Sequence, residues 1–465
     1  MKTFLRTLRK VVLWGLAIVV ILVATLFVIN SRDERLSPQT ARLLTARTNP
    51  YPANENLYFM LSGLDAPPGG SVIATGEARV QAYEAWLRKA SGPSDLPPDK
   101  ALQGALEFKG TLPWSRQSVG ALWHEADGHR LEIERLVTDN RELYRRYRAL
   151  HTASGYYETA TPSIYAMPPF PPSRLRHLFL AYFAVRMKSG VLASQSAALA
   201  AVGDDLQVWR KVLLGDGSLI SKMVAVAYLR QDFLLLGNMT ADPGLRLGAL
   251  QKTLKLVVNP FPLGDWKIGQ AFAHEFRVDA RLLRTLYRMT PYANEHISVW
   301  AKFLNWVGKP FYRLHATENF DAENAVKFIA IANGPPRKLE SAMAAYSNEI
   351  DCMGTPKLSC LYNPIGKILS AIAAPAYEQY PLRAYDVAAL QRMVRLAYAI
   401  RVQKVPMGDI VSFMRRHPDW STHPVTGVQF NFDQATTRLS VVPTSEQQKH
   451  RKLDIPVWHA ETFGR

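Results

Sequence analysis

Two histidine–glutamate pairs are the residues of this chain best suited to catalysis or metal binding. His274 and Glu275 lie in a segment with helical spacing, between two phenylalanines that make their surroundings apolar. Apolar surroundings raise the pKa of a carboxylic acid, so Glu275 would be able to act as a general acid. Because Arg277 and Arg281 follow closely, a structural salt bridge is the interpretation that we favour, and catalysis is the alternative.

The second pair, His124 and Glu125, precedes His129 in the sequence HEADGH. A zinc protease needs its two histidines four residues apart, so that both imidazoles lie on one face of a helix. The spacing here is five, and we therefore expect surface polar residues and no metal site. The GDG sequence at 215–217 lacks the preceding strand and the third glycine of a dinucleotide loop, so it predicts a helix break and no cofactor site.

The chain has two cysteines, Cys352 and Cys360, in a stretch with the glycine and proline typical of a loop. In an oxidising compartment a pair this close is expected to form a disulfide. Closing so short a loop stabilises the fold by about 2.5 kcal/mol on the chain-entropy model. Unpaired buried thiols are the alternative. Zinc binding is disfavoured because no histidine or second cysteine pair lies at ligand spacing.

The elements that would position these residues are mainly helical. Leu175, Leu178, Phe179 and Tyr182 recur at the spacing of one helix face, and the segment 219–236 is apolar enough to be buried all round. Further helices are expected at about 75–90, 192–214, 244–257, 268–289, 294–307, 321–333, 338–350, 364–374 and 385–404. Pairs of helices separated by glycine favour stacked αα-hairpins, although no clean repeat period is present.

Two local predictions refine this fold. Asp321 is expected to cap the N-terminus of the helix at 321–333, and Ser173 that of the helix that follows a proline-rich linker. Strand signals are confined to 428–442, where two short alternating segments flank residues 434–437 as a β-hairpin. The expected fold class is therefore mainly α, with a small β-hairpin near the C-terminus.

The N-terminal region predicts a transmembrane helix. Residues 11–29 contain nineteen consecutive residues without a charge, which at ~1.5 Å per residue match the thickness of a bilayer's hydrocarbon core. Bulky residues end this stretch where a signal peptidase needs small ones, so we favour an uncleaved anchor over a cleaved signal peptide. Four basic residues lie within 1–10, and the positive-inside rule therefore places that end in the cytoplasm.

The predicted domain organisation is sequential along the chain. It consists of a cytoplasmic N-terminus (1–10), a transmembrane helix (11–30), a polar stalk (31–53), a first helical part (54–170), a central αα-hairpin region (171–350) and a C-terminal part with the disulfide loop, helices and hairpin (351–465). This organisation predicts an inner-membrane protein that crosses the bilayer once, with its ectodomain in the periplasm or outside the cell.

Charge narrows the class of partner. The net charge is +17, from 56 lysines and arginines against 39 aspartates and glutamates, and the excess is spread evenly along the chain. An even spread gives no compact basic patch, so no nucleic-acid partner is expected. A solvated basic surface is the simpler interpretation, and attraction to an anionic lipid or glycan is the alternative.

Three segments carry a resemblance to known proteins: the core stretch at 198–236, the sequence AHEFRVDARLL at 273–283, and the tail with HPVTGVQFNFD at 423–433. In overall arrangement the chain resembles a family of uncharacterised, membrane-anchored helical envelope proteins of bacteria. The resemblance covers about residues 54–442 and implies the same architecture. It implies no activity, because it rests on diffuse pattern and no catalytic signature.

These observations favour a membrane-tethered helical envelope protein with a scaffold or interaction role. Its expected partners are the lipid bilayer and either another envelope protein or an anionic glycan or lipid, because stacked helical hairpins commonly present binding surfaces. The alternative is a hydrolase that acts on envelope material through a catalytic carboxylate, with His274 and Glu275 as the first residues to test. No other catalytic residue is indicated.

Overall fold

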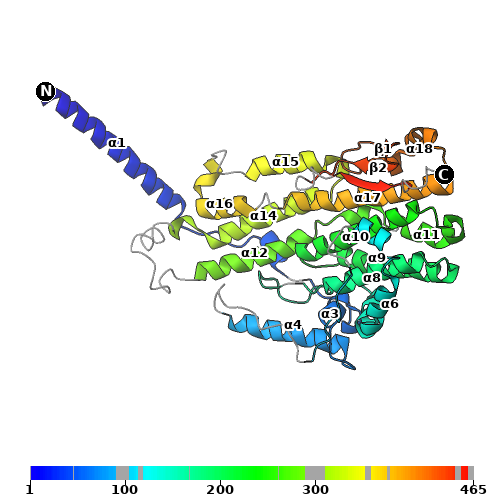
Figure 1. Cartoon of the computed structure of the whole chain (residues 1–465). Helices are drawn as coiled ribbons and strands as arrows, with labels where there is room; N and C mark the ends of the chain where they lie inside the picture. The colour runs from blue at the N-terminus through cyan, green and yellow to red at the C-terminus, as the bar shows by residue number, and fades with distance from the viewer. Residues whose placement is uncertain are drawn as a thin grey trace. The chain divides into compact units, whose positions relative to one another are not determined.

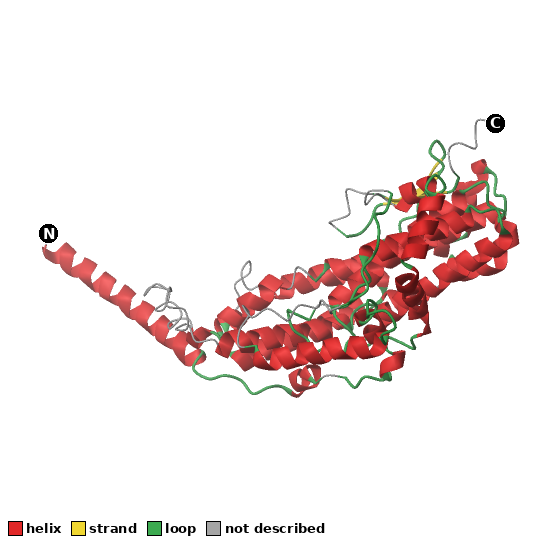
Figure 2. Ribbon diagram, turned by 60° about the horizontal axis from the view of Figure 1, so that its bottom comes forward, coloured by secondary structure: helices red, strands yellow, loops and turns green. Residues whose placement is uncertain are grey.

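The chain folds mainly into helices, as expected (Figures 1 and 2). The computed structural model describes residues 2–45, 47–90, 104–113, 119–166, 168–259, 261–288, 309–350, 358–373, 377–445 and 452–458. Its α-helices are α1 (Lys2–Ile29), α2 (Pro38–Leu44), α3 (Leu57–Ser62), α4 (Val72–Lys89), α5 (Val119–Glu125), α6 (Arg130–Asp139), α7 (Arg141–Ala149), α8 (Ser173–Met187), α9 (Leu192–Leu214), α10 (Leu219–Ala241), α11 (Gln251–Val257), α12 (Ala271–Arg288), α14 (Leu314–Ala332), α15 (Leu339–Ile350), α16 (Pro364–Ala373), α17 (Gln379–Val402), α18 (Ile410–Arg416) and α19 (Pro418–Ser421). The helix expected at 294–307 lies outside the described residues.

Helix α1 contains the apolar segment that the sequence predicts. Its residues Val12–Ile29 have a mean hydropathy of 3.0, and none of them is buried within the structure. This is the length and composition that crossing a membrane requires, and a signal sequence has the same properties.

The chain divides into two compact units, each made of segments far apart in the sequence. Unit 1 contains residues 1–46, 276–328 and 342–378, and unit 2 contains residues 47–275, 329–341 and 379–465. The divisions fall inside α12, α14 and α15. They do not coincide with the sequential boundaries at 170 and 350 that composition indicates, because contacts between distant segments define each unit.

The core of unit 2 is built around α10. This helix packs against α9, α17 and α5, and α8 packs on α9. Leu229, Phe233 and Leu236 of α10 are fully buried, as are Leu390 and Met393 of α17. Most of α10 is buried, as its apolar composition predicts, and its exposed residues Ile220 and Ala227 lie on one face.

The predicted β-hairpin is confirmed, and it belongs to a sheet of three antiparallel strands. Strands β1 (Asn431–Asp433) and β2 (Arg438–Val441) pair across the expected turn. The third strand, β3 (Leu453–Pro456), was not predicted; it pairs with β2 and sets Leu439 opposite Ile455. Ile455 packs against Gly237 of α10, where an added Cβ would lie 3.0 Å from the isoleucine side chain. Four residues are too few for alternation alone to indicate a strand.

Two cap predictions are wrong. Asp321 lies in the middle of α14, which begins seven residues earlier at Leu314, and Ser173 is the first residue of α8, after Pro172. The carboxylate that accepts hydrogen bonds at the start of α14 is that of Asp33. It accepts from the backbone N–H groups of His315 at 3.1 Å and Ala316 at 3.0 Å. A cap supplied from so far away in the sequence leaves no local signal.

Unit 1 incorporates the first half of the segment expected to be a stalk. The backbone N–H of Ser37 and the hydroxyl of Thr40 both donate to Asn319 Oδ1, at 2.9 and 2.8 Å. Leu43 and Leu44 of α2 pack on a buried cluster that includes Phe276. Residues 33–44 are therefore packed in unit 1, because their polar and apolar side chains both find partners there.

The end of α1 is held in the same unit, beside α16 and the start of α14 (Figure 1). Asn30 is fully buried directly after this helix. Its amide donates to the Leu361 carbonyl at 2.8 Å and accepts from the Asn363 N–H at 2.7 Å, and Arg313 Nε donates to its carbonyl at 2.6 Å. These bonds fix how the chain leaves α1.

Candidate functional site

His274 and Glu275 are brought together with a buried polar cluster at the start of α10. His274 Nε2 lies 3.6 Å from Glu158 Oε2, and Glu275 Oε1 accepts a hydrogen bond from the Leu219 N–H at 2.7 Å. Glu158 also accepts from the Ser218 N–H at 2.9 Å. Both carboxylates therefore bind backbone N–H groups that the first turn of a helix leaves without an internal partner.

The hydroxyl groups of this cluster all point to Glu158. Its Oε1 accepts from Tyr156 at 2.7 Å and Ser218 at 3.0 Å, and also from Ser221. A hydrolytic triad needs the imidazole between the nucleophile and the carboxylate. Here the carboxylate occupies the middle position, between the hydroxyls and His274. The arrangement is that of a helix cap, and it accounts for both sequence-predicted residues structurally.

Lys222 caps the C-terminus of α9, the helix that precedes α10. Its ammonium donates to the carbonyls of Val212 at 2.7 Å and Gly215 at 2.5 Å, at the C-terminus of α9. Burial lowers the pKa of Lys222 to about 8, against the opposing effect of Glu158. The GDG sequence thus lies between two helix ends whose free backbone groups are satisfied by Glu158, Glu275 and Lys222.

The structure also shows where the other candidate site residues lie. His124 is exposed at the end of α5, and His129 lies 3.4 Å from Glu132 on the surface of α6. Cys352 lies outside the described residues and Cys360 lies in a short 3-10 turn, 358–361, so the disulfide stays a prediction.

The tail sequence HPVTG is explained by a second buried cluster. His423 Nε2 lies 3.2 Å from Asp386 Oδ1, and His423 Nδ1 accepts from the Val425 N–H at 3.2 Å. Asp386 of α17 also accepts from the N–H and hydroxyl of Thr444, each at 2.8 Å. The cluster joins the C-terminal loops to α17, and it is a structural device of unit 2 that the sequence did not predict.

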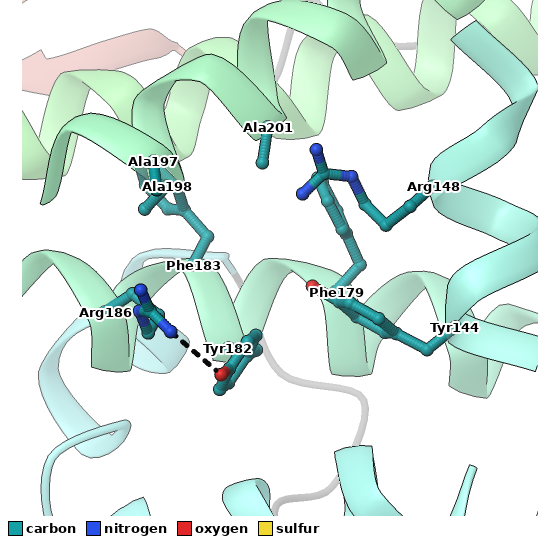
Figure 3. A pocket seen from close by; sticks show the side chains of 9 residues that line it. All are labelled: Tyr144, Arg148, Phe179, Tyr182, Phe183, Arg186, Ala197, Ala198 and Ala201. Carbon is teal, nitrogen blue, oxygen red and sulfur yellow. Dashed lines mark hydrogen bonds between the residues drawn. The ribbon is translucent and has the colours of Figure 1, made fainter. Parts of the chain in front are cut away.

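A pocket that sequence reasoning did not identify lies between α7, α8 and α9 of unit 2 (Figure 3). It encloses about 130 Å³. The residues that line it are mainly aromatic or small: Tyr144, Arg148, Phe179, Tyr182, Phe183, Arg186, Ala197, Ala198 and Ala201. Tyr144 and Tyr182 meet edge to face with their ring centroids 5.8 Å apart. The alanines of α9 leave the space that the rings of α8 do not fill.

Two arginines give this apolar pocket a positive charge. Arg148 extends toward it from α7, and Arg186 lies on its other side next to Tyr182 (Figure 3). Arg148 forms a salt bridge with Asp204 at 3.2 Å. Among the described residues, Arg186 donates to two hydroxyls, those of Ser194 at 2.5 Å and Tyr182 at 3.2 Å. Within the described part of the chain no carboxylate lies at ion-pair distance from Arg186, so this charge is available to an anion.

A buried ionic network lies next to the pocket. Arg176 of α8 is 1% exposed and donates to Asp232 at 2.5 Å, to the Tyr147 hydroxyl at 2.9 Å, and to Asp205. Tyr147 in turn packs on Phe179, with ring centroids 5.4 Å apart. Phe179 and Tyr182 belong to the helix face that the sequence spacing predicts. Arg176 lies on the same helix, but nothing in the sequence around it indicates that it is buried.

No protein-family model, curated protein or solved structure matches this chain. The resemblance to membrane-anchored envelope proteins therefore stays a prediction. Inferences about function rest on the contacts within each unit.

Proposed function

We propose that this chain is a membrane-tethered binding protein, and that the pocket between α7, α8 and α9 takes an anionic amphiphile of the cell envelope. The observation that carries the proposal is the pairing of an apolar, aromatic-walled pocket with Arg186, whose partners within the described residues are neutral hydroxyls. Aromatic and alanine side chains favour an acyl or aromatic group, and a guanidinium at the rim favours a carboxylate, sulfonate or phosphate.

The binding test uses the full chain in nanodiscs and a small aromatic anion, 2-naphthalenesulfonate, as the probe. We expect saturable binding by calorimetry, and Arg186→Gln should weaken it about tenfold, since one charge-assisted hydrogen bond contributes about 1.5 kcal/mol or more. Ala197→Phe should abolish binding, because Ala197 is an exposed lining residue and a ring there closes the mouth of the pocket.

Two controls make this test specific. Arg145 is on the same helix as Arg148, but it is 68% exposed, pairs with Glu142 and does not line the pocket. The variant Arg145→Gln should therefore leave the affinity unchanged. The neutral analogue 2-naphthalenesulfonamide should bind about tenfold more weakly than the anion. Equal binding of the two ligands, or affinity that survives both pocket substitutions, would contradict the proposal.

The tether makes a separate prediction about topology. The basic N-terminus and apolar α1 support an arrangement with residues 31–465 outside the cytoplasm. A reporter enzyme that is active only outside the cytoplasm, fused after residue 465, is expected to be active in membrane fractions. Activity of a cytoplasm-only reporter at the same position would reverse the orientation, and recovery of a soluble chain that starts after residue 30 would remove the tether.

A further inference from the structure

The surface of unit 1 next to α1 carries apolar side chains that the fold does not cover. Leu358 is 87% exposed and Leu361 is 41% exposed, both in the short turn at 358–361. This turn is bonded directly to the end of α1, because the Leu361 carbonyl accepts from Asn30. Single exposed leucines are ordinary on a protein surface. Their position at the end of an apolar segment of membrane-spanning length is what sets these two apart.

The residues around the turn have the composition of a membrane interface. The Tyr362 hydroxyl donates to the Arg32 carbonyl at 3.1 Å, and Phe27 of α1 meets Phe311 edge to face at 5.1 Å. Aromatic and basic side chains of this kind mark the level of the lipid head groups, because an apolar body and a polar tip suit both sides of the boundary.

A polar cavity of about 510 Å³ opens beside the same turn. Its lining includes Lys367 together with the carboxylates of Glu34 and Glu323. Lys367 lies across the Phe320 ring at 5.5 Å and donates to the Ser359 carbonyl at 2.5 Å, which joins the cavity to the turn. Glu34 is oriented by the Asn319 amide at 2.8 Å. The cavity thus presents one cation, Lys367, and two carboxylates, of which Glu323 is also paired with Lys327 at 2.9 Å.

We propose that the end of unit 1 next to α1 is a phospholipid-binding surface: Leu358 and Leu361 enter the acyl region, and the cavity lined by Glu34, Glu323 and Lys367 takes a head group that carries a phosphate and a primary ammonium. Lys367 is the partner for the phosphate, and the two glutamates are the partners for the ammonium. This inference rests on the tether of the proposed function and is independent of the anion pocket in unit 2.

Photocrosslinking in nanodiscs tests the contact with acyl chains. With benzoylphenylalanine in place of Leu358, we expect a lipid adduct by mass spectrometry. The negative control is Val326, which is also in unit 1 and is 38% exposed. It lies on α14, twelve residues after the first residue of that helix, Leu314. At ~1.5 Å per residue this places it about 18 Å further along the helix. It should give no adduct. A positive control replaces Val20 within α1.

Each outcome of the crosslinking has one meaning. An adduct at position 20 without one at 358 overturns the surface and leaves the tether intact. No adduct at position 20 overturns the tether and this inference together. Equal adducts at 358 and 326 also contradict the surface, because they show no dependence on distance from α1. The anion pocket is tested separately by the binding of 2-naphthalenesulfonate.

Lipid retention tests the head-group site. The full chain is extracted in mild detergent from nanodiscs that contain equal amounts of phosphatidylethanolamine, phosphatidylcholine and phosphatidylglycerol, and retained lipid is identified by native mass spectrometry. We expect phosphatidylethanolamine to dominate, and Glu34→Gln or Lys367→Gln to lower its retention about tenfold. Glu349→Gln, at a 59% exposed glutamate of unit 1 outside the cavity lining, is the control. Equal retention of all three lipids would overturn the assignment.

Discussion

Replacing Arg176 by methionine is expected to lower the free energy of unfolding of unit 2 by about 3–5 kcal/mol. The guanidinium is buried beside two aspartates that are themselves buried, Asp205 (4% exposed) and Asp232 (fully buried). It also lies over the Tyr228 ring at 5.0 Å. Methionine fills a similar volume, so packing is largely kept while the cation bonded to both carboxylates is lost. The expected cost is that of an uncompensated buried charge.

The two aspartates are expected to differ in their response. Burial raises the pKa of Asp232 well above its ordinary value, and Arg176 opposes this only in part. A raised pKa means that the neutral acid costs less free energy at Asp232 than at an ordinary aspartate, so a neutral amide should be tolerated there. Asp232→Asn should cost about 1 kcal/mol, because the amide resembles the protonated acid. Asp205→Asn should cost several times more.

Denaturant unfolding followed through tryptophan fluorescence, to which Trp209 beside Tyr228 contributes, measures these differences. The triple variant Arg176→Met, Asp205→Asn, Asp232→Asn should recover most of the stability lost in Arg176→Met, because no charge then remains without a partner. Equal effects of the two asparagine substitutions would contradict the difference expected from the raised pKa of Asp232. Because Phe179 packs on this network, Arg176→Met should also weaken binding of 2-naphthalenesulfonate.

Lowering the pH from 8 to 5 is expected to stabilise unit 1 relative to a variant that lacks Asp321. Burial raises the pKa of Asp321 to about 7, and the nearby carboxylates of Asp279 and Glu318 add to this effect. Burial also raises the pKa of Asp279 to about 6. Between about pH 4 and 7 the folded state therefore binds more protons than the unfolded state. Stability is full below the unfolded pKa of 3.8 and falls as the pH rises toward 7.

Asp321→Asn isolates this contribution. Asp321 Oδ1 accepts a hydrogen bond from Ser370, and an amide oxygen keeps that bond. The variant should match the wild-type chain below about pH 4, and its advantage in free energy of unfolding should grow by on the order of 2 kcal/mol between pH 5 and pH 8. Thermal unfolding of both chains across this range is the measurement. A constant difference between them would contradict the assignment.

Local pattern was sufficient for most helices. The segment at 192–214 was predicted with the bounds that α9 has, and α10 and α17 were placed from apolar composition and periodicity. The start of α14 was not, because its capping carboxylate comes from Asp33. The strand β3 was missed for a related reason, since four residues become a strand only when β2 supplies their hydrogen-bond partners.

The candidate sites were less accessible to sequence reasoning than the helices. Phe179 and Tyr182 were expected to share a face, and they do line one pocket. Their partner Arg186 is one of many arginines in a basic chain, and only the neutral character of its neighbours distinguishes it. His274 and Glu275 attracted attention through their apolar setting, but that setting is a helix junction in which Glu275 caps α10.

The sequence by itself determined the apolar segment at 11–29, the positive charge of residues 1–10 before it, and the helical class of the residues after it, because each of these is a property of consecutive residues. Only the tertiary structure decided which charges are paired and which are open to a ligand. A carboxylate or guanidinium has the same local signal in every case, and its role depends on the neighbour that folding brings within about 3 Å.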